Sequence, residues 1–197
     1  MPRVVDREAR RAELVSAAEA VFAKQGVANT AVSDIVKAAG VAQGTFYLYF
    51  DSKDDAVLAV VDRIAQGLVE ETTDRVATSV SAVDKIMSFS GVLSDAGSEP
   101  GAAALVDLMH LPENRLLHDR LAEDMTGRLV PLLRGVIQQG VTEGDFAVDD
   151  PQAAAWFVLA GMRSVELAGT PLTGMPAALA KATALALRAL GYAGAQA

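Results

Sequence analysis

Side chains able to hydrogen-bond to nucleic acid are concentrated in one short segment, AQGTFYLYF, at residues 42–50. At helical spacing Phe46 and Phe50 fall on one face, which we expect to pack inward. The opposite face then carries Gln43, Gly44, Thr45, Tyr47, Leu48 and Tyr49. Amide and hydroxyl groups can bind base edges or phosphates, and a glycine allows a backbone to approach closely. The segment is therefore predicted to be a contact surface for DNA.

A second set of reactive groups surrounds His110, with Asp107 three residues before it and Glu113 three residues after it. This spacing is compatible with a metal or proton-transfer site on one helix face. The other histidine, His118, lies beyond the helix-breaking Pro112, and the chain has no cysteine to add a thiolate ligand. We expect no metal and no cofactor, and a helical metalloenzyme is the alternative from another functional class.

The composition indicates closely packed helices. Of the 197 residues, 51% are hydrophobic but only 5% are aromatic, so Ala, Val and Leu must supply most of the core. The absence of cysteine excludes a disulfide framework and a thiol nucleophile. Every apolar stretch is interrupted before about 18 residues, so no membrane span is expected.

Charge is distributed unevenly along the chain. The formal net charge is -8, which by itself disfavours binding to phosphates. Residues 1–53 nevertheless hold seven Lys or Arg against six Asp or Glu, whereas the rest hold ten against nineteen. The N-terminus is charged and lacks the apolar region of a secretory signal, so a cytoplasmic protein is expected. A chain whose remaining residues are acidic can still have an N-terminal domain that binds DNA.

The N-terminal third has the pattern of a helix-turn-helix. Apolar residues recur at helical spacing over residues 8–25, and Gly26 is suited to end that helix. A second, short helix is predicted over residues 31–39, ending at Gly40, and a third over residues 42–50. Two short helices joined by a tight turn, the second carrying polar and aromatic side chains, are typical of a motif that enters the major groove.

Further helices account for the rest of the chain, and no segment has the pattern of a strand. Ser52 is a suitable N-cap for a long fourth helix, and Pro151 suits the first turn of a later one. Pro131 lies inside another, where we expect a kink or a one-turn interruption near residues 127–130. After the fourth helix, helices are predicted over residues 82–95, 102–111, 113–143, 151–168 and 175–190.

Residues 26–58, GVANTAVSDIVKAAGVAQGTFYLYFDSKDDAVL, resemble the DNA-binding signature of the tetracycline-repressor (TetR) family. The segment LLRGVIQQGVTEGDF is similar to a looser feature of the same family. The resemblance implies an all-α protein with an N-terminal three-helix helix-turn-helix domain at residues 8–68. A larger helical ligand-binding and dimerisation domain is implied at residues 69–197. The matching positions are Gly26, Thr30, Val32, Asp34, Ile35, Ala39, Gly40, Val41, Gly44, Thr45, Phe46, Tyr47, Tyr49, Phe50, Ser52 and Lys53.

The resemblance also implies roles for residues of the motif. Lys53 matches a phosphate contact at a helix N-terminus, and Thr30 matches the cap of the second helix. Ala31 and Ala42 stand where hydroxyl residues are usual and Ser33 where a basic residue is common, so Arg3, Arg7, Arg10 and Arg11 are candidates to compensate. The implied DNA contacts are Thr30, Ser33, Gln43, Gly44, Thr45, Tyr47, Leu48, Tyr49 and Lys53.

For the body, the resemblance implies a ligand cavity and a dimer interface on the last two helices. These predict a repressor that a small molecule releases from a palindromic operator, with a carrier that no longer binds DNA as the remaining alternative. An apolar effector is expected, and Asp107, Glu123 and Asp124 leave a cationic one open. The apolar members of the predicted pocket are equally suited to be core residues. The predicted pocket residues are Met87, Phe89, Asp107, Met109, His110, Met125, Trp156, Phe157 and Met162, and the predicted interface residues are Ala154, Leu159, Ala178, Ala182 and Leu185.

Overall fold

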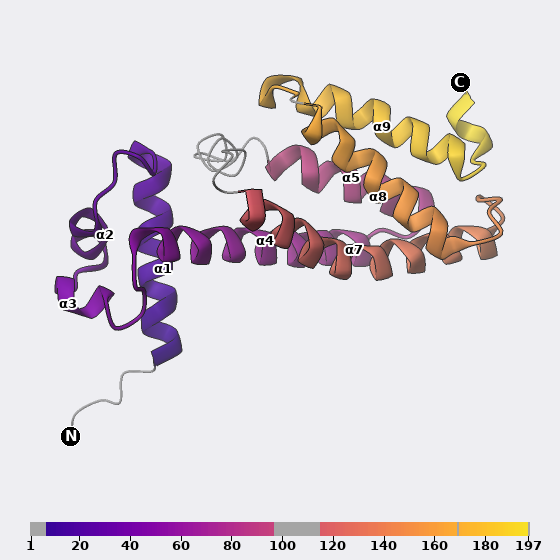
Figure 1. Cartoon of the computed structure of the whole chain (residues 1–197). Coiled ribbons are helices and arrows are strands. Elements are labelled where there is room, and N and C mark those ends of the chain that lie inside the picture. The colour runs from indigo at the N-terminus through magenta and orange to yellow at the C-terminus, as the bar shows by residue number, and fades with distance from the viewer. Residues whose placement is uncertain (1–6, 97–114, 169, 197) are drawn as a thin grey trace. The chain divides into compact units, whose positions relative to one another are not determined.

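The computed structural model describes residues 7–96, 115–168 and 170–196, and these residues are helical without any strand (Figure 1). The all-α prediction is confirmed. Within the described residues, no helix is long and apolar enough to cross a membrane. The α-helices are α1 (Arg7–Gln25), α2 (Val32–Ala39), α3 (Gln43–Phe46), α4 (Lys53–Thr78), α5 (Ala82–Ala96), α7 (Arg115–Glu143), α8 (Pro151–Leu167) and α9 (Met175–Ala189), with short 3-10 helices η2 (Leu172–Gly174) and η3 (Ala193–Gln196).

Two compact units make up the chain. The described residues 7–65 and 115–119 belong to the first, and residues 66–96, 120–168 and 170–196 belong to the second. The division falls inside the continuous helix α4, between Ala65 and Gln66. The domain boundary predicted at residues 68 and 69 stays a prediction.

The first unit is built around α1, α2, α3 and the beginning of α4. Its core consists of apolar side chains from all four helices, with Leu14, Phe22, Ile35, Phe46 and Val60 fully buried. Gly26 and Gly40 end α1 and α2 with φ values of 77° and 66°, a conformation that costs other residues steric energy. The sequence prediction of both helix ends is confirmed.

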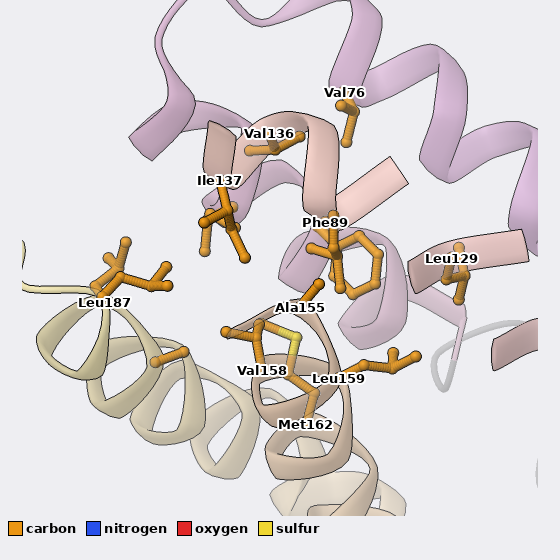
Figure 2. Close-up of a cluster of buried hydrophobic side chains, with 14 of the residues drawn as sticks. Val76, Phe89, Leu129, Val136, Ile137, Ala155, Val158, Leu159, Met162 and Leu187 are labelled. Atoms are coloured by element: carbon orange, nitrogen blue, oxygen red, sulfur yellow. The ribbon is translucent and has the colours of Figure 1, made fainter. Parts of the chain in front are cut away.

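The second unit packs α5, α7, α8 and α9 around a single apolar cluster that also includes Val76 of α4. Figure 2 shows Phe89, Met162, Val158 and Ile137 in this cluster. Asp150 caps α8 because its Oδ1 accepts hydrogen bonds from the backbone N–H groups of Gln152 (2.9 Å) and Ala153 (3.1 Å). The cluster holds together helices that are rich in alanine.

Two sequence predictions about helices need correction. Of the kink or one-turn interruption expected near residues 127–130, the interruption is absent, since α7 is continuous from Arg115 to Glu143, and the kink stays a prediction. Pro131 has no backbone N–H and so cannot donate a helical hydrogen bond. The helix continues past it because Leu129, Val130 and Leu133 are buried in the core, while Pro131 itself is exposed. The third helix is shorter than predicted and ends at Phe46. The helix predicted at residues 102–111 lies outside the described residues.

Candidate nucleic-acid interface

The turn between α2 and α3 is closed by backbone hydrogen bonds around Gly40. The N–H of Gly40 donates to the carbonyl of Lys37 over 3.3 Å, and the N–H of Val41 donates to the carbonyl of Val36 over 3.0 Å. A left-handed glycine, followed by a residue whose N–H donates to the carbonyl five positions earlier, is a common helix C-cap. The turn therefore fixes where α3 begins relative to α2.

After Phe46, hydrogen bonds between residues three apart occur beside one last bond of the helical, four-residue type. Leu48 donates to Thr45 over 3.2 Å, and the carbonyl of Phe46 accepts from both Tyr49 (3.0 Å) and Phe50 (3.1 Å). Such bonds tighten the chain at the end of a helix. They explain why the predicted helix over residues 42–50 contracts to α3 followed by turns.

The two faces of the segment differ sharply in exposure. Phe46 and Phe50 are buried with ring centroids 5.3 Å apart, whereas Tyr47 is 52% and Leu48 is 68% exposed. Gln43 and Gly44 are also exposed, and Thr45 and Tyr49 are half-buried. Phe46 and Phe50 therefore anchor the segment while the predicted contact residues lie on or near the surface.

A shallow cleft of about 430 Å³ lies beside this surface, between α1 and the turn that precedes α3. Arg10 of α1 lines it and forms an ion pair with Glu13. The Arg11 guanidinium lies 5.3 Å from the centroid of the buried Phe50 ring, a cation–π contact. The other lining residues are Val41, Ala42, Thr45, Leu48 and Tyr49.

The beginning of α2 is held by a carboxylate that the sequence analysis missed. Asp34 Oδ2 accepts from the backbone N–H of Ala31 (3.0 Å) and from the Gln25 side-chain amide (3.2 Å). An acidic residue at the third helical position is a recognisable capping signal even without a hydroxyl N-cap. The role predicted for Thr30 was wrong, because the N-cap is Ala31 and the buried Thr30 hydroxyl donates to the Gly26 carbonyl over 2.7 Å.

The ammonium group of Lys53 is directed into the protein. Its Nζ donates to the backbone carbonyls of Val27 (2.9 Å) and Thr30 (3.0 Å), and the side chain is half-buried. The adjacent Ser52 hydroxyl caps α4 by accepting from the N–H of Asp55 over 3.1 Å. The sequence analysis predicted the Ser52 cap but missed the two carbonyl partners of Lys53, which are 26 and 23 residues away in the chain. Ser33 of α2 is exposed.

The residues predicted to line a ligand pocket do not form one surface. Phe89 and Met162 are buried in the apolar cluster of the second unit (Figure 2). Met125 is partly buried and packs against the same cluster. Met87, Trp156 and Phe157 are instead 55%, 53% and 63% exposed. Asp107, Met109 and His110 lie outside the described residues.

The predicted interface residues of α8 and α9 also differ among themselves. Leu185 is 59% exposed, and Ala154, Ala178 and Ala182 are half-buried. Leu159 packs into the core at 4% exposure. Periodicity placed these helices correctly but did not separate their inner and outer faces.

The residues of the predicted metal alternative, Asp107, His110 and Glu113, lie outside the described residues. Among the residues that the structure describes, no group of three or more histidine, cysteine or acidic side chains is placed to hold a metal ion. In the second unit, the half-buried Arg163 lies 3.4 Å from the Thr126 hydroxyl.

Comparison with known proteins agrees with the assignment of the N-terminal unit to DNA binding. The sequence profile of bacterial regulatory proteins of the tetR family matches residues 14–60. The chain is 28% identical over 134 residues to the fatty acid metabolism regulator protein of Bacillus subtilis, covering 68% of this chain and 69% of that protein. It is 27% identical over 150 residues to the transcriptional repressor KstR2 of Rhodococcus jostii, covering 73% and 71%.

The fold extends this likeness to nearly the whole chain. The structure of the regulator FadR from Bacillus subtilis in complex with stearoyl-CoA matches with a TM-score of 0.65 at 20% identity. The match covers 89% of this chain and 97% of that one. The body therefore shares its fold with a regulator that has been crystallised with a bound ligand.

Proposed function

We propose that this chain, a transcriptional regulator of the TetR type, is a homodimeric repressor which a small molecule releases from a near-palindromic operator. The observation that carries the proposal is the two-faced segment after Gly40. Its aromatic anchors are buried, whereas Tyr47 and Leu48 are more than half exposed. The curated relatives are regulators, so we assign no catalytic step.

The exposed side chains favour a particular kind of base reading. α3 and the turns after it contain no Lys or Arg, the side chains that most often recognise guanine. Gln43 is suited to bidentate contact with adenine, and the apolar Leu48 is suited to a thymine methyl group. We therefore propose that each half-site is read mainly at A·T pairs.

Selection of duplexes from a random DNA library tests this proposal with the full chain. The expected product has two inverted half-sites about 10–10.5 base pairs apart from centre to centre, or a multiple of this, because successive major grooves recur at that spacing. Gln43→Ala is expected to relax the base preference while general affinity remains. Failure to enrich any duplex would overturn the repressor assignment.

The dimer is proposed to form through the outer faces of α8 and α9. Trp156 and Phe157 of α8 and Leu185 of α9 are each more than half exposed, and large exposed apolar side chains often mark a protein interface. Alanines on both helices allow close approach, and a helix-turn-helix needs a pair of copies to read a two-fold site. Leu159 is buried in the core and is therefore left out of the proposed interface, which includes Trp156 and Phe157 instead.

Light scattering on Phe157→Asp tests the interface. A carboxylate that cannot be solvated between two subunits costs several kcal/mol, so monomers are expected. Val80→Asp is the matched control, because Val80 is 85% exposed in the same unit but lies outside α8 and α9. A dimer that persists in Phe157→Asp and Leu185→Asp would place the interface elsewhere.

The effector is proposed to be a mostly apolar molecule that binds among α5, α7 and α8. Phe89 and Met162 belong to the apolar cluster there, Met125 packs against that cluster, and methionine adapts to irregular apolar ligands. About 3 kcal/mol of coupling would change operator affinity roughly a hundredfold, provided that the ligand prefers the form that does not bind DNA. A DNA-binding regulator of this kind is proposed to act in the cytoplasm.

Stearoyl-CoA, present in the related FadR structure, is the first compound to test. A thermal-shift screen that includes it and other apolar acyl and aromatic compounds should find stabilising ligands. The same ligands should dissociate the chain from its selected operator. Tight binders that leave operator affinity unchanged would contradict the release mechanism while leaving DNA binding intact.

A further inference from the structure

The two hydrogen bonds of Lys53 join the start of α4 to the loop between α1 and α2. The acceptors are the carbonyls of Val27 and Thr30, at 2.9 and 3.0 Å from Nζ. Hydrogen bonds from a charged donor are roughly twice as strong as those between neutral groups. The contact thus ties the first turn of α4 to that loop by two charged hydrogen bonds.

The electrostatics of this position explain why the ammonium points inward. A cation in the first turn of a helix is repelled by the positive end of the helix dipole, which the neighbouring Asp54 and Asp55 offset only in part. The two loop carbonyls that accept from Nζ, one shortly after the end of α1 and one just before the N-cap of α2, carry negative partial charge. The ammonium of Lys53 is therefore attracted to these two carbonyls and away from the positive end of the α4 dipole.

The loop that Lys53 holds is itself tightly bonded. The Thr30 hydroxyl donates to the Gly26 carbonyl, and Asp34 binds the backbone of Ala31 and the side chain of Gln25. A bonded loop transmits displacement to α2, and α2 is joined to α3 by the short turn at Gly40. Fixing residues 26–31 against α4 thus fixes the placement of α3.

We propose that Lys53 is a positioning residue for DNA binding, which orients α2 and α3 on α4 through the carbonyls of Val27 and Thr30 and is not itself the phosphate contact. The inference rests on the proposed operator binding. Moving the ammonium onto a phosphate would remove a charged donor from two partly buried carbonyls, which carries a free-energy cost. Two of its three N–H donors are already used.

Lys53→Met in the full chain tests the proposal, with Lys24→Met as the matched control because Lys24 is an exposed lysine of α1. Affinity for the selected operator and for an unrelated duplex is measured across a range of KCl concentrations. Lys53→Met is expected to lower operator affinity at least tenfold, to lower it less for the unrelated duplex, and to leave the salt slope unchanged. Amide hydrogen exchange over residues 26–31 should accelerate. Lys24→Met should leave all four measurements as in wild type.

A phosphate contact gives the opposite pattern. The salt slope would then fall by about 0.9, both duplexes would weaken equally, and amide exchange would stay as in wild type. That pattern, or an unchanged operator affinity, would overturn the proposal. A wild-type chain that enriches no operator would instead defeat the proposed function.

A measurement on wild-type protein covers the case in which Lys53→Met does not fold. Lysine acetylation followed by mass spectrometry should modify Lys53 more slowly than the exposed Lys37, both with and without operator duplex. Acetylation of Lys53 as fast as Lys37 in free protein, with protection only on adding duplex, would overturn the proposal.

Discussion

The two units of this regulator are specified in different ways. In the first unit, particular residues at helix ends set the geometry: Gly40 has φ 66°, Asp34 binds the N-terminus of α2, and Ser52 caps α4. The second unit depends on a broad apolar cluster spread over several helices, with a small buried hydroxyl pair between Ser90 and Thr183. A site built on specific turns can be located from sequence, whereas a cavity inside a generic apolar core cannot.

The largest expected effect tests the core of the second unit. Phe89→Ala should lower the free energy of unfolding by about 3–5 kcal/mol, because it removes a fully buried ring. Met87→Ala on the same helix is the control and should change it by no more than about 0.5 kcal/mol, since Met87 is 55% exposed. Urea denaturation measures both. A small loss for Phe89→Ala would mean that the ring faces an open cavity.

Two glycine substitutions compare the units directly. Gly40→Ala should destabilise the protein by about 1–2 kcal/mol, because alanine is strained at a φ of 66°. Gly67→Ala lies inside α4, where an added Cβ meets nothing within 4 Å, and should stabilise by about 0.5–1 kcal/mol. Thermal melts distinguish the two signs. Equal changes would contradict the importance assigned to the turn at Gly40.

The smallest effect concerns Glu143 in the second unit. A hydrogen bond from Gln139, and then one from the backbone N–H of Ala82, lower the pKa of this carboxyl below its ordinary value of 4.5. Ionised Glu143 therefore stabilises the fold above pH 4.5, and the contribution disappears as the pH falls through the lowered pKa. Glu143→Gln should be slightly less stable than wild type at pH 7, with the gap closing below pH 4.5. A gap that stays constant down to pH 3 would contradict this.

The limits of sequence reasoning are clear in α5. Met87 and Phe89 were grouped by residue type as pocket candidates, yet positions two apart are about 200° apart around a helix and cannot share a face. One is exposed and the other buried. Trp156 and Met162 of α8 were grouped by the same reasoning and separate in the same way. Assigning helix faces first would have found this difference.

Contacts between distant residues were harder to predict than helices. The helix order, the ends at Gly26 and Gly40 and the inward face of Phe46 and Phe50 followed from periodicity and turn chemistry. The carbonyl partners of Lys53 did not, because any solvent-facing anion, including a phosphate, would satisfy an ammonium equally well in the absence of tertiary structure. Ala31 lacks the hydroxyl that marks an N-cap, so the compensating role of Asp34 was also missed.

The central claim is that the exposed face of α3 and of the turn after it contacts DNA, whereas the buried face holds the fold together. Measuring operator binding by Tyr47→Ala tests this claim most directly. Tyr47 is 52% exposed and its neighbour Phe46 is fully buried. Tyr47→Ala should melt close to the wild-type temperature and bind the selected operator at least about tenfold more weakly, a loss of about 1.4 kcal/mol or more. Wild-type operator affinity in a folded Tyr47→Ala protein would contradict the account.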